Sequence, residues 1–226
     1  MVYAPLLKRC TSVIYEGKPV GTPDASNFWR TIERHSVNAL FTAPTAIRVL
    51  KKADPHGDLP GNFNLKSLKT LFLAGERADT ATIQWAEKTL NIPVRDNWWQ
   101  TETGWPMCAN MVGVDGYLPV SYGSVYRSVP GYDIQVLDDD HNPVPSGTLG
   151  TLAVKLPLPP GSLLTIYNND ERFLSSYLQA IPGFYDTGDA GTIDDDGHVR
   201  VMSRTDDIIN CSGHRLSCGA MEEVRS

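Results

Sequence analysis

Short apolar segments alternate with amphipathic segments along the first half of this chain, and this alternation constrains the fold more than any other feature. Residues 39–42, 71–74 and 94–96 have the composition of buried strands. Pro44 opens a predicted helix after the first of them, and a second helix is expected from Thr80. Strands that alternate with helices indicate a parallel sheet, and ligands collect at the carboxyl ends of its strands.

The second half of the chain has a different texture. After about residue 121, short β-like runs are broken by turn residues at 138–140 and 142–143, which predicts a small antiparallel sheet or barrel. The acidic turn at 194–197 predicts a hairpin. The chain therefore combines an α/β part with a β-rich part.

One polar and aromatic stretch, residues 96–104, follows the predicted strand 94–96. It contains two indoles, two amides, two hydroxyls and two carboxylates in nine positions, a mixture that burial alone does not require. Such a set suits a site that stacks a flat base and holds a phosphate with its metal. An aromatic-rich turn with capping polar groups is the alternative. Because residues 75–76 also follow a predicted strand, both motifs are expected at one crevice.

Composition excludes several classes of function. The net charge of −6 over 226 residues argues against a nucleic-acid partner, which would need a basic face. No apolar run approaches the roughly 20 residues that span a bilayer, so no membrane partner is expected. The four cysteines form no Cys-x-x-Cys metal pair and are expected to be reduced thiols in an intracellular compartment, cytoplasmic or mitochondrial.

Four further motifs accompany residues 96–104 in a fixed order: Ala-Gly-Glu-Arg at 74–77, Tyr-Asp-Thr-Gly-Asp at 185–189, Ser-Arg-Thr-Asp-Asp-Ile-Ile at 203–209 and Ser-Gly-His-Arg at 212–215. This ordered set resembles the adenylate-forming acyl-CoA synthetases, and within them the short-chain acetyl- and propionyl-CoA synthetases. The resemblance covers essentially the whole chain. It implies an α/β fold that forms part of a large N-terminal domain, with a mostly parallel sheet, helices and a small β-rich subdomain.

The same resemblance implies the domain order and the chemistry. Residues 1–120 would form the α/β subdomain, 121–203 the β-rich subdomain, and 204–226 a hinge and the start of a C-terminal lid. The parent protein would activate a short-chain carboxylate, propionate before acetate, with ATP and Mg²⁺ through an acyl-adenylate, and transfer it to coenzyme A. Its partners would be these small molecules, and its oligomeric state stays open.

Residue roles are carried over on the matching motifs. Asp189 would bind both ribose hydroxyls, since a carboxylate accepts two hydrogen bonds side by side, and Arg204 would approach the same ribose. Trp98 would stack on adenine, a contact of about 1–3 kcal/mol, with the backbone of 75–77 on the other face. The alternatives are a cap for Asp189 and a solvated arginine for Arg204. The nucleotide set implied by the resemblance is Gly75, Glu76, Arg77, Asp96, Asn97, Trp98, Gln100, Thr101, Asp189, Arg204, Ser212 and Gly213.

The catalytic set implied by the resemblance is Thr101, Glu102 and Arg215. Thr101 would donate to the α-phosphate, Glu102 would bind Mg²⁺, and Arg215 would reach a phosphate. The alternative for the first two is N-capping of a following helix, which Gly104 and Pro106 disfavour.

Acyl and coenzyme A binding are assigned to other positions. Trp99 would close the acyl pocket, which Ala74 would also line, although a core role for Trp99 stays open. Ser212 and Gly213 would line the approach of coenzyme A. Asp206 would be the hinge of the lid.

The sequence also departs from the family. We expect its phosphate loop to lie upstream of residue 1 and the lid lysine beyond residue 226, so that this chain alone is inactive. Arg9 stands where the family more often has glycine. A truncated, non-catalytic nucleotide-binding or interaction module is the main alternative, and an adenylation domain that loads a carrier protein is a weaker one.

Overall fold

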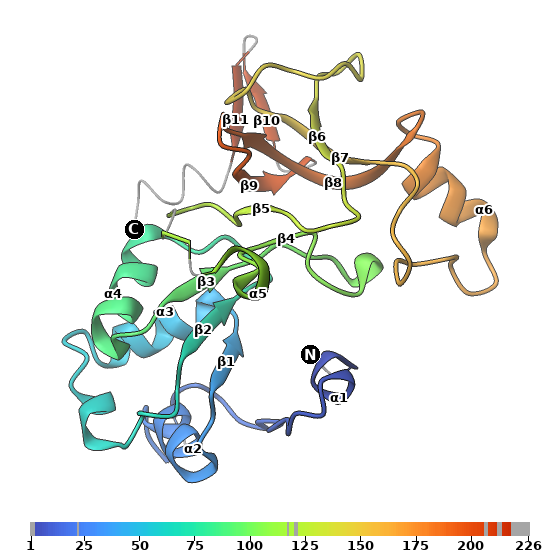
Figure 1. The fold of residues 1–226 in the computed structure, drawn as a ribbon. Helices are drawn as coiled ribbons and strands as arrows, with labels where there is room; N and C mark the ends of the chain where they lie inside the picture. The colour runs from blue at the N-terminus through green and yellow to red at the C-terminus, as the bar shows by residue number, and fades with distance from the viewer. Residues whose placement is uncertain are drawn as a thin grey trace. The chain divides into compact units, whose positions relative to one another are not determined.

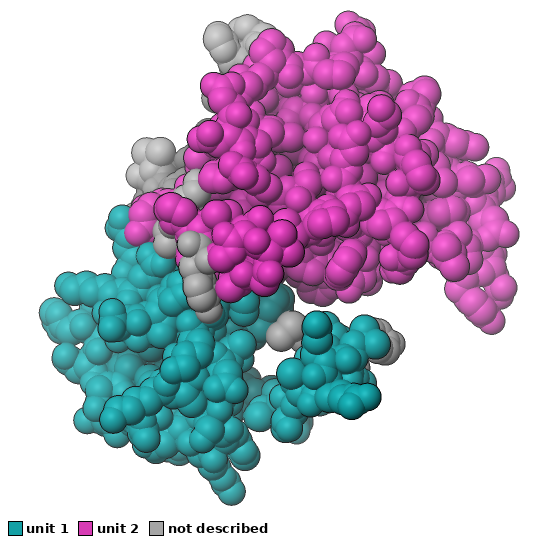
Figure 2. All heavy atoms as spheres, viewed as in Figure 1, with its two compact units in different colours: residues 1–72, 81–94 teal, residues 73–80, 95–226 magenta. Residues whose placement is uncertain are grey.

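The computed structural model describes residues 3–21, 23–116, 118–119, 122–205, 208–211 and 214–217, the last two segments by their backbone only. The chain divides into two compact units (Figure 2). Unit 1 comprises residues 1–72 and 81–94, and unit 2 comprises residues 73–80 and 95–226. The three-part domain division drawn from the sequence stays a prediction.

Unit 1 contains helices around a short sheet (Figure 1). Its elements are α1 (Tyr3–Leu7), α2 (Asn27–His35), β1 (Ala39–Thr42), α3 (Pro44–Ala53), η1 (Leu59–Asn62), β2 (Thr70–Leu73), α4 (Thr80–Leu90) and β3 (Val94–Asp96). The sheet is parallel, in the order β1-β2-β3, and the ends of β2 and β3 continue into unit 2. Trp29 and Ile32 of α2, Ile47 and Leu50 of α3 and Leu71 of β2 are buried.

The strand and helix predictions for this half are confirmed closely. Pro44 occupies the first turn of α3, where its missing N–H is no loss. The predicted strand 71–74 is one residue early in the structure, at Thr70–Leu73, and β3 has the predicted bounds. Buried apolar faces at helical or strand spacing explain this success.

Unit 2 is dominated by β-structure (Figure 1). Its elements are η2 (Thr101–Thr103), β4 (Cys108–Ala109), α5 (Val112–Asp115), β5 (Arg127–Ser128), β6 (Ile134–Leu137), β7 (Gly150–Lys155), α6 (Asp170–Phe173), η3 (Leu174–Leu178), β8 (Phe184–Ile193), β9 (Val199–Arg204), β10 (Ile208–Cys211) and β11 (His214–Ser217). Strands β6-β7-β8-β9 form one antiparallel sheet in that order. This confirms the predicted antiparallel sheet, including the hairpin of β8 and β9.

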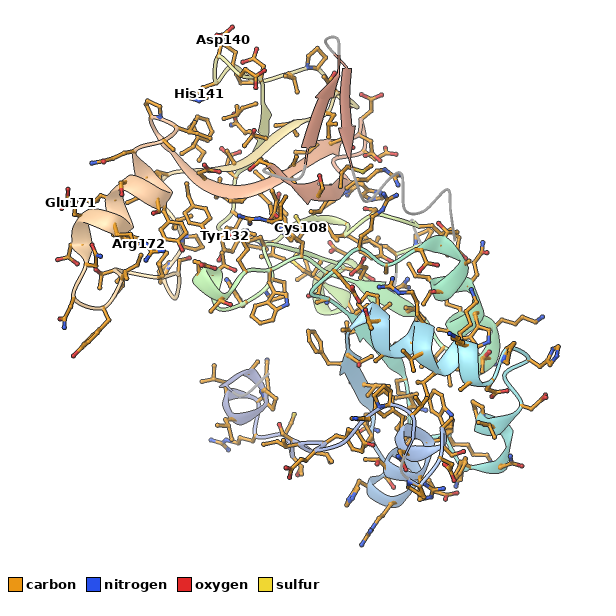
Figure 3. All side chains as sticks on the ribbon, turned by 180° about the vertical axis from the view of Figure 1, so that it is seen from behind. Cys108, Tyr132, Asp140, His141, Glu171 and Arg172 are labelled. Atoms are coloured by element: carbon orange, nitrogen blue, oxygen red, sulfur yellow. The ribbon has the colours of Figure 1, made fainter. Side chains whose placement is uncertain are left out.

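The core of unit 2 lies against this sheet. Met107, Cys108, Leu152, Val154 and Tyr185 belong to one buried cluster. The labelled side chains Cys108 and Tyr132 lie in this core, whereas Glu171 and Arg172 lie on α6 at the surface (Figure 3).

Irregular pairing shapes β8 and β9 where the motif 185–189 runs. Leu152 of β7 pairs with Asp189 and Ala153 with Asp186, so Thr187 and Gly188 are extra residues on β8. Gly188 adopts a φ of +64°, and Met202 is likewise extra on β9. Such bulges redirect side chains beside functional sites, and this one sets the position of Asp189.

No helix in the described ranges combines the length and the apolar character that crossing a membrane requires.

Candidate functional site

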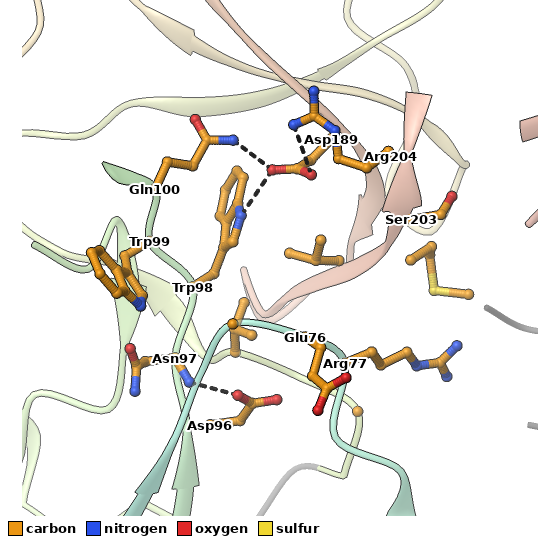
Figure 4. Close-up of a pocket in the computed structure, with 15 residues that line it drawn as sticks. Glu76, Arg77, Asp96, Asn97, Trp98, Trp99, Gln100, Asp189, Ser203 and Arg204 are labelled. Atoms are coloured by element: carbon orange, nitrogen blue, oxygen red, sulfur yellow. Dashed lines mark hydrogen bonds and ion pairs between the residues drawn. The ribbon is translucent and has the colours of Figure 1, made fainter. Parts of the chain in front are cut away.

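A cavity of about 330 Å³ lies entirely within unit 2 (Figure 4). Four parts of the chain form it: the turn after β2, the segment that leaves β3, residues near the start of β5, and strands β8 and β9. Its lining residues are Gly75, Glu76, Arg77, Asp96, Asn97, Trp98, Trp99, Gln100, Gly123, Val125, Asp189, Val201, Met202, Ser203 and Arg204. The structure thus brings together ten of the residues that the sequence singled out.

The turn after β2 begins with a glycine that needs its conformation rather than extra room. Gly75 has a φ of +101°, in a region that other residues rarely adopt. A Cβ at this position would meet no described atom within 4 Å. The glycine therefore lets the chain turn sharply at the strand end, and it exposes the backbone of 75–77 to the cavity.

Asp96 and Asn97 stand at the end of β3. Asp96 is buried, and its Oδ1 accepts the backbone N–H of Asn97 at 2.9 Å. Burial raises the pKa of Asp96 to about 7, because desolvation outweighs the backbone hydrogen bonds that favour the charged form. Asn97 Nδ2 donates to the carbonyl of Leu73 at 2.8 Å, which fixes the direction of the amide.

Two buried polar atoms on the cavity lining have no hydrogen-bond partner among the described residues. They are Asn97 Oδ1 and Ser203 Oγ. An unsatisfied buried group costs about 1–3 kcal/mol, so such atoms mark places where a polar ligand would bind favourably.

Asp189 contacts three other side chains that line the cavity (Figure 4). Its Oδ2 accepts Trp98 Nε1 at 3.1 Å and Gln100 Nε2 at 2.7 Å, and Arg204 Nη1 lies 3.5 Å from Oδ1. Burial raises the pKa of Asp189, while the positive charge of Arg204 and the two hydrogen bonds act in the opposite direction. Trp98 and Asp189 are 91 positions apart in the sequence, and they share one cavity.

The two adjacent tryptophans differ in burial. Trp98 is 7% exposed and packs in the core of unit 2 while it lines the cavity. Trp99 is 37% exposed on the same cavity. Alternation along an extended segment turns the two indoles to opposite sides, so they serve different parts of the site.

Thr101 and Glu102 form a single 3-10 turn, η2, just outside the lining of this cavity. Thr101 is exposed, and Glu102 Oε1 accepts the hydroxyl of Tyr177 at 2.9 Å. The turn is closed by Thr103, whose backbone N–H donates to the carbonyl of Gln100 at 3.1 Å. The capping contacts of this turn are made by the side chains of Gln100 and Thr103, not by those of Thr101 and Glu102.

The remaining predicted positions lie elsewhere. Ala74 is buried and is not among the lining residues. Asp206, Ser212 and Gly213 lie outside the described residues. The backbone of Arg215 pairs with Asn210 in the hairpin of β10 and β11, but its side chain lies outside the description.

Several residues of the site escaped the sequence analysis. Tyr185 and Thr187 belong to the motif at 185–189, in which a role was predicted from the sequence for Asp189 only. In the structure, the hydroxyl of Tyr185 donates to Gln100 Oε1 at 2.8 Å. Tyr177 lies in a segment with no recognisable motif. Gly123, Val125 and Met202 also line the cavity, and they belong to no motif that the sequence singled out.

One known protein family and several known proteins are similar to this chain. The model of the family described as "AMP-binding enzyme" matches residues 1–159. The chain is 49% identical over 221 residues to the mitochondrial acyl-CoA synthetase short-chain family member 3 of Bos taurus, covering 98% of this chain and 32% of that protein. It is 42% identical over 225 residues to the propionate–CoA ligase of Salmonella typhimurium, covering 99% and 35%.

Two further matches complete the comparison. An uncharacterized protein of Pseudomonas aeruginosa is 53% identical over 223 residues, covering 99% of this chain and 35% of that protein. The crystal structure of the anthranilate CoA ligase AuaEII in complex with anthranoyl-AMP superposes with a TM-score of 0.78 over 95% of this chain and 38% of that one, at 23% identity, and shows the fold.

The chain spans about a third of the length of the curated relatives that it matches. The resemblance to short-chain acyl-CoA synthetases and the fold class inferred from the ordered motifs are both confirmed. Because the family model covers more than half of its residues, the chain belongs to the AMP-binding enzyme family.

Proposed function

We propose that the protein containing this chain activates a short-chain carboxylate, propionate before acetate, with ATP and transfers the acyl group to coenzyme A. One observation carries this proposal: an indole, Trp98, and a carboxylate, Asp189, from distant segments meet in a single cavity beside the Gly75 turn. A flat apolar face next to a charged acceptor suits a nucleoside. The names of the relatives support the same acid–thiol ligase class.

The adenine would bind between the Trp98 ring and the backbone of residues 75–77. Stacking of a base on an aromatic ring contributes about 1–3 kcal/mol. Asn97 Oδ1 lacks a partner among the described residues and lines the same cavity, so it would accept a hydrogen bond from the exocyclic amine. Asp96, Glu76 and Arg77 would complete the surroundings of the base.

The ribose would bind at Asp189 and Arg204. Asp189 Oδ2 already accepts two hydrogen bonds, from Trp98 and Gln100, and this leaves Oδ1 as the main acceptor for ribose hydroxyls. Arg204 lies near Oδ1 and would donate to the same sugar. Asp189 would then bind both ribose hydroxyls, as the sequence predicts, chiefly through Oδ1.

The phosphates and Mg²⁺ would be held by Thr101, Glu102 and Arg215. In the described residues no group of three or more His, Cys, Asp or Glu side chains could hold a metal. A lone carboxylate such as Glu102 still fits Mg²⁺, which proteins often bind through one or two carboxylates together with substrate phosphates. The ion would supply charge neutralisation, while the hydroxyl of Thr101 would donate to the α-phosphate.

Acyl specificity is proposed to come from Trp99 with Ala74. The 37% exposed indole of Trp99 lies on the cavity wall next to the proposed adenine site, and its bulk would exclude long acyl chains. Ser212 and Gly213 would line the approach of coenzyme A. Asp206 would serve as the hinge between the two subdomains, residues 1–120 and 121–203, and the lid that starts within residues 204–226. The proposed location is intracellular, cytoplasmic or mitochondrial, and the mitochondrial relatives support it.

The test is ATP–pyrophosphate exchange by the full-length protein that contains this chain, with acetate, propionate and butyrate as acids. We expect exchange with all short acids and the highest kcat/KM with propionate. The absence of exchange with every acid, despite tight binding of AMP, would favour the non-catalytic nucleotide-binding module instead.

A further inference from the structure

Two stacked tyrosines connect the proposed sugar site to the proposed metal ligand. The rings of Tyr177 and Tyr185 lie 5.7 Å apart with an interplanar angle of 7°. Tyr177 donates its hydroxyl to Glu102 Oε1 at 2.9 Å, and Tyr185 donates its hydroxyl to Gln100 Oε1 at 2.8 Å. The two hydroxyls thus reach two neighbouring but different parts of the site.

The contacts of the Gln100 amide determine its direction. Nε2 donates to Asp189 Oδ2 at 2.7 Å and to the carbonyl of Thr187 at 2.6 Å, two groups that can only accept. Oε1 accepts the hydroxyl of Tyr185 at 2.8 Å and the backbone N–H of Thr103. A reversed amide would place its oxygen against the Asp189 carboxylate and lose these hydrogen bonds, so the Tyr185 hydroxyl helps to hold the Gln100 donor against Asp189.

The Tyr177 contact depends on an unusual piece of backbone. Tyr177 lies in η3, a π-helical turn that continues directly from the single α-helical turn α6. Turns of this kind are rare and often occur at functional sites, because they shift a side chain out of the regular helical position. Here the shift brings the Tyr177 ring onto Tyr185 and its hydroxyl onto Glu102.

We propose that Tyr177 and Tyr185 are positioning residues with separate targets: Tyr185 orients the ribose-binding carboxylate Asp189 through Gln100, and Tyr177 orients the Mg²⁺-binding carboxylate Glu102. The proposal deepens the proposed function and rests on it. Tyr→Phe substitution at either position keeps the stacked ring and removes only the hydroxyl, so each contact is separately testable.

The role of Tyr185 in orienting Asp189 is tested by calorimetry, in which the full-length protein is titrated with AMP in the presence of EDTA. Tyr185→Phe should weaken AMP binding about fivefold, the effect of one lost hydrogen bond in a shared network. Gln100→Leu, which removes the donor itself, should weaken it about tenfold. The double variant should be no weaker than Gln100→Leu alone, because both changes break the same chain of contacts.

The role of Tyr177 in orienting Glu102 is tested by measuring ATP binding as a function of Mg²⁺ concentration. Tyr177→Phe should raise the Mg²⁺ concentration needed for half-maximal enhancement of ATP binding about tenfold, as loss of an outer partner of a metal ligand does. AMP binding in EDTA should stay at the wild-type value for this variant. Tyr185→Phe should show the reverse pattern.

Tyr132→Phe is the matched control. Tyr132 belongs to the same buried cluster as Tyr185, and its hydroxyl contacts Ser162 Oγ, Trp105 Nε1 and the backbone carbonyl of Thr103 but neither carboxylate. It should lower the melting temperature without moving either binding readout. The inference is wrong if Tyr177→Phe and Tyr185→Phe change both readouts equally, or change neither, while the wild type binds AMP. If the wild type binds no AMP, the proposed function itself fails.

Discussion

At the scale of single residues, burial changes the chemistry of the side chains around the cavity. Asp96 and Asp189 line the same cavity and both have raised pKa values, yet only Asp189 has a nearby cation and two side-chain donors. Elsewhere Arg9 has a φ of +55°, a left-handed conformation that glycine adopts at lower cost. The glycine that the resemblance implies for the family at this position would adopt this conformation without that cost.

Asp96→Asn should change how stability depends on pH. The folded pKa of Asp96 is about 7, above the ordinary value of 3.8 for an aspartate, so the folded state binds more protons than the unfolded state between these values. The free energy of unfolding of the wild type should therefore fall as pH rises from about 4 to about 7, by at most about 1.4 kcal/mol per pH unit from this group. Asparagine cannot titrate and should lack this decline. Urea unfolding at pH 5 and pH 8 (chosen to lie on either side of about pH 7) checks it, and parallel pH profiles for the two proteins would contradict it.

Trp99→Ala should widen the acid specificity of the full-length protein. Each extra methylene that then becomes buried would contribute about 0.8 kcal/mol, or about fourfold in kcat/KM. We expect kcat/KM to rise for hexanoate and to fall for propionate, measured with a series of linear acids. Trp85→Ala, in α4 of unit 1, is the control and should leave the ranking of acids unchanged. The same ranking for both variants would remove Trp99 from the acyl pocket.

At the scale of elements, the site depends on departures from regular strands. The regular pairing of the strands is interrupted by extra residues, which are Thr187 and Gly188 on β8 and Met202 on β9. At the bulge on β8, hydrogen bonds of side chains hold the backbone in place of the regular strand pairing. Thr187 Oγ1 donates to the carbonyl of Leu152 at 2.6 Å and accepts the N–H of Asp189 at 3.1 Å. These bonds hold the bulge and present Asp189 to the cavity.

Gly188→Ala should separate binding from stability at this bulge. A Cβ at Gly188 would lie 2.4 Å from Arg204 Nη2, so the guanidinium must leave Asp189. We expect AMP binding by the full-length protein to weaken about tenfold, since a charge-assisted contact is lost. Gly197→Ala is a matched control because Gly197 also has a positive φ, +78°, but its added Cβ would meet no described atom within 4 Å. Both variants should lose about 1 kcal/mol of stability, and only Gly188→Ala should lose affinity. Equal affinities would show that the position of Arg204 does not matter.

At the scale of the whole molecule, the cavity is built within one compact unit, whereas we expect the proposed reaction to need more of the protein than this chain. The lining comes from unit 2 alone, and the chain spans about a third of its curated relatives. Nucleotide binding and catalysis are thus expected to separate experimentally.

The 226-residue chain should bind AMP but form no propionyl-adenylate. We expect no adenylate because the phosphate loop and the lid lysine implied by the family are not within these residues. The charge on the reacting phosphates would then not be neutralised. Mass spectrometry after incubation with ATP, Mg²⁺ and propionate detects the adenylate, with the full-length protein as positive control. Adenylate produced by the chain alone would overturn the expectation.

The sequence by itself determined the main strands of the first half, the starts of two helices and the family. Apolar periodicity located β1, β2 and β3 to within about one residue and the first turns of α3 and α4, because burial of one face is a local property of the chain. Helix α2 was not predicted. The ordered motifs led to the correct family and grouped ten of the cavity's lining residues in advance.

Only the tertiary structure decided how those residues act on one another. That Gln100 lies between Tyr185 and Asp189, that Tyr177 reaches Glu102, and that Asp189 retains one oxygen for a ligand all depend on pairs separated by 75 to 91 positions. The orientation of these side chains depends on backbone bulges and on packed rings. The spacing of motifs in the sequence does not predict either of them. Contacts of this kind form only when the sheet and the turn η2 come together in space, and this is why the sequence located the site while the fold set its geometry.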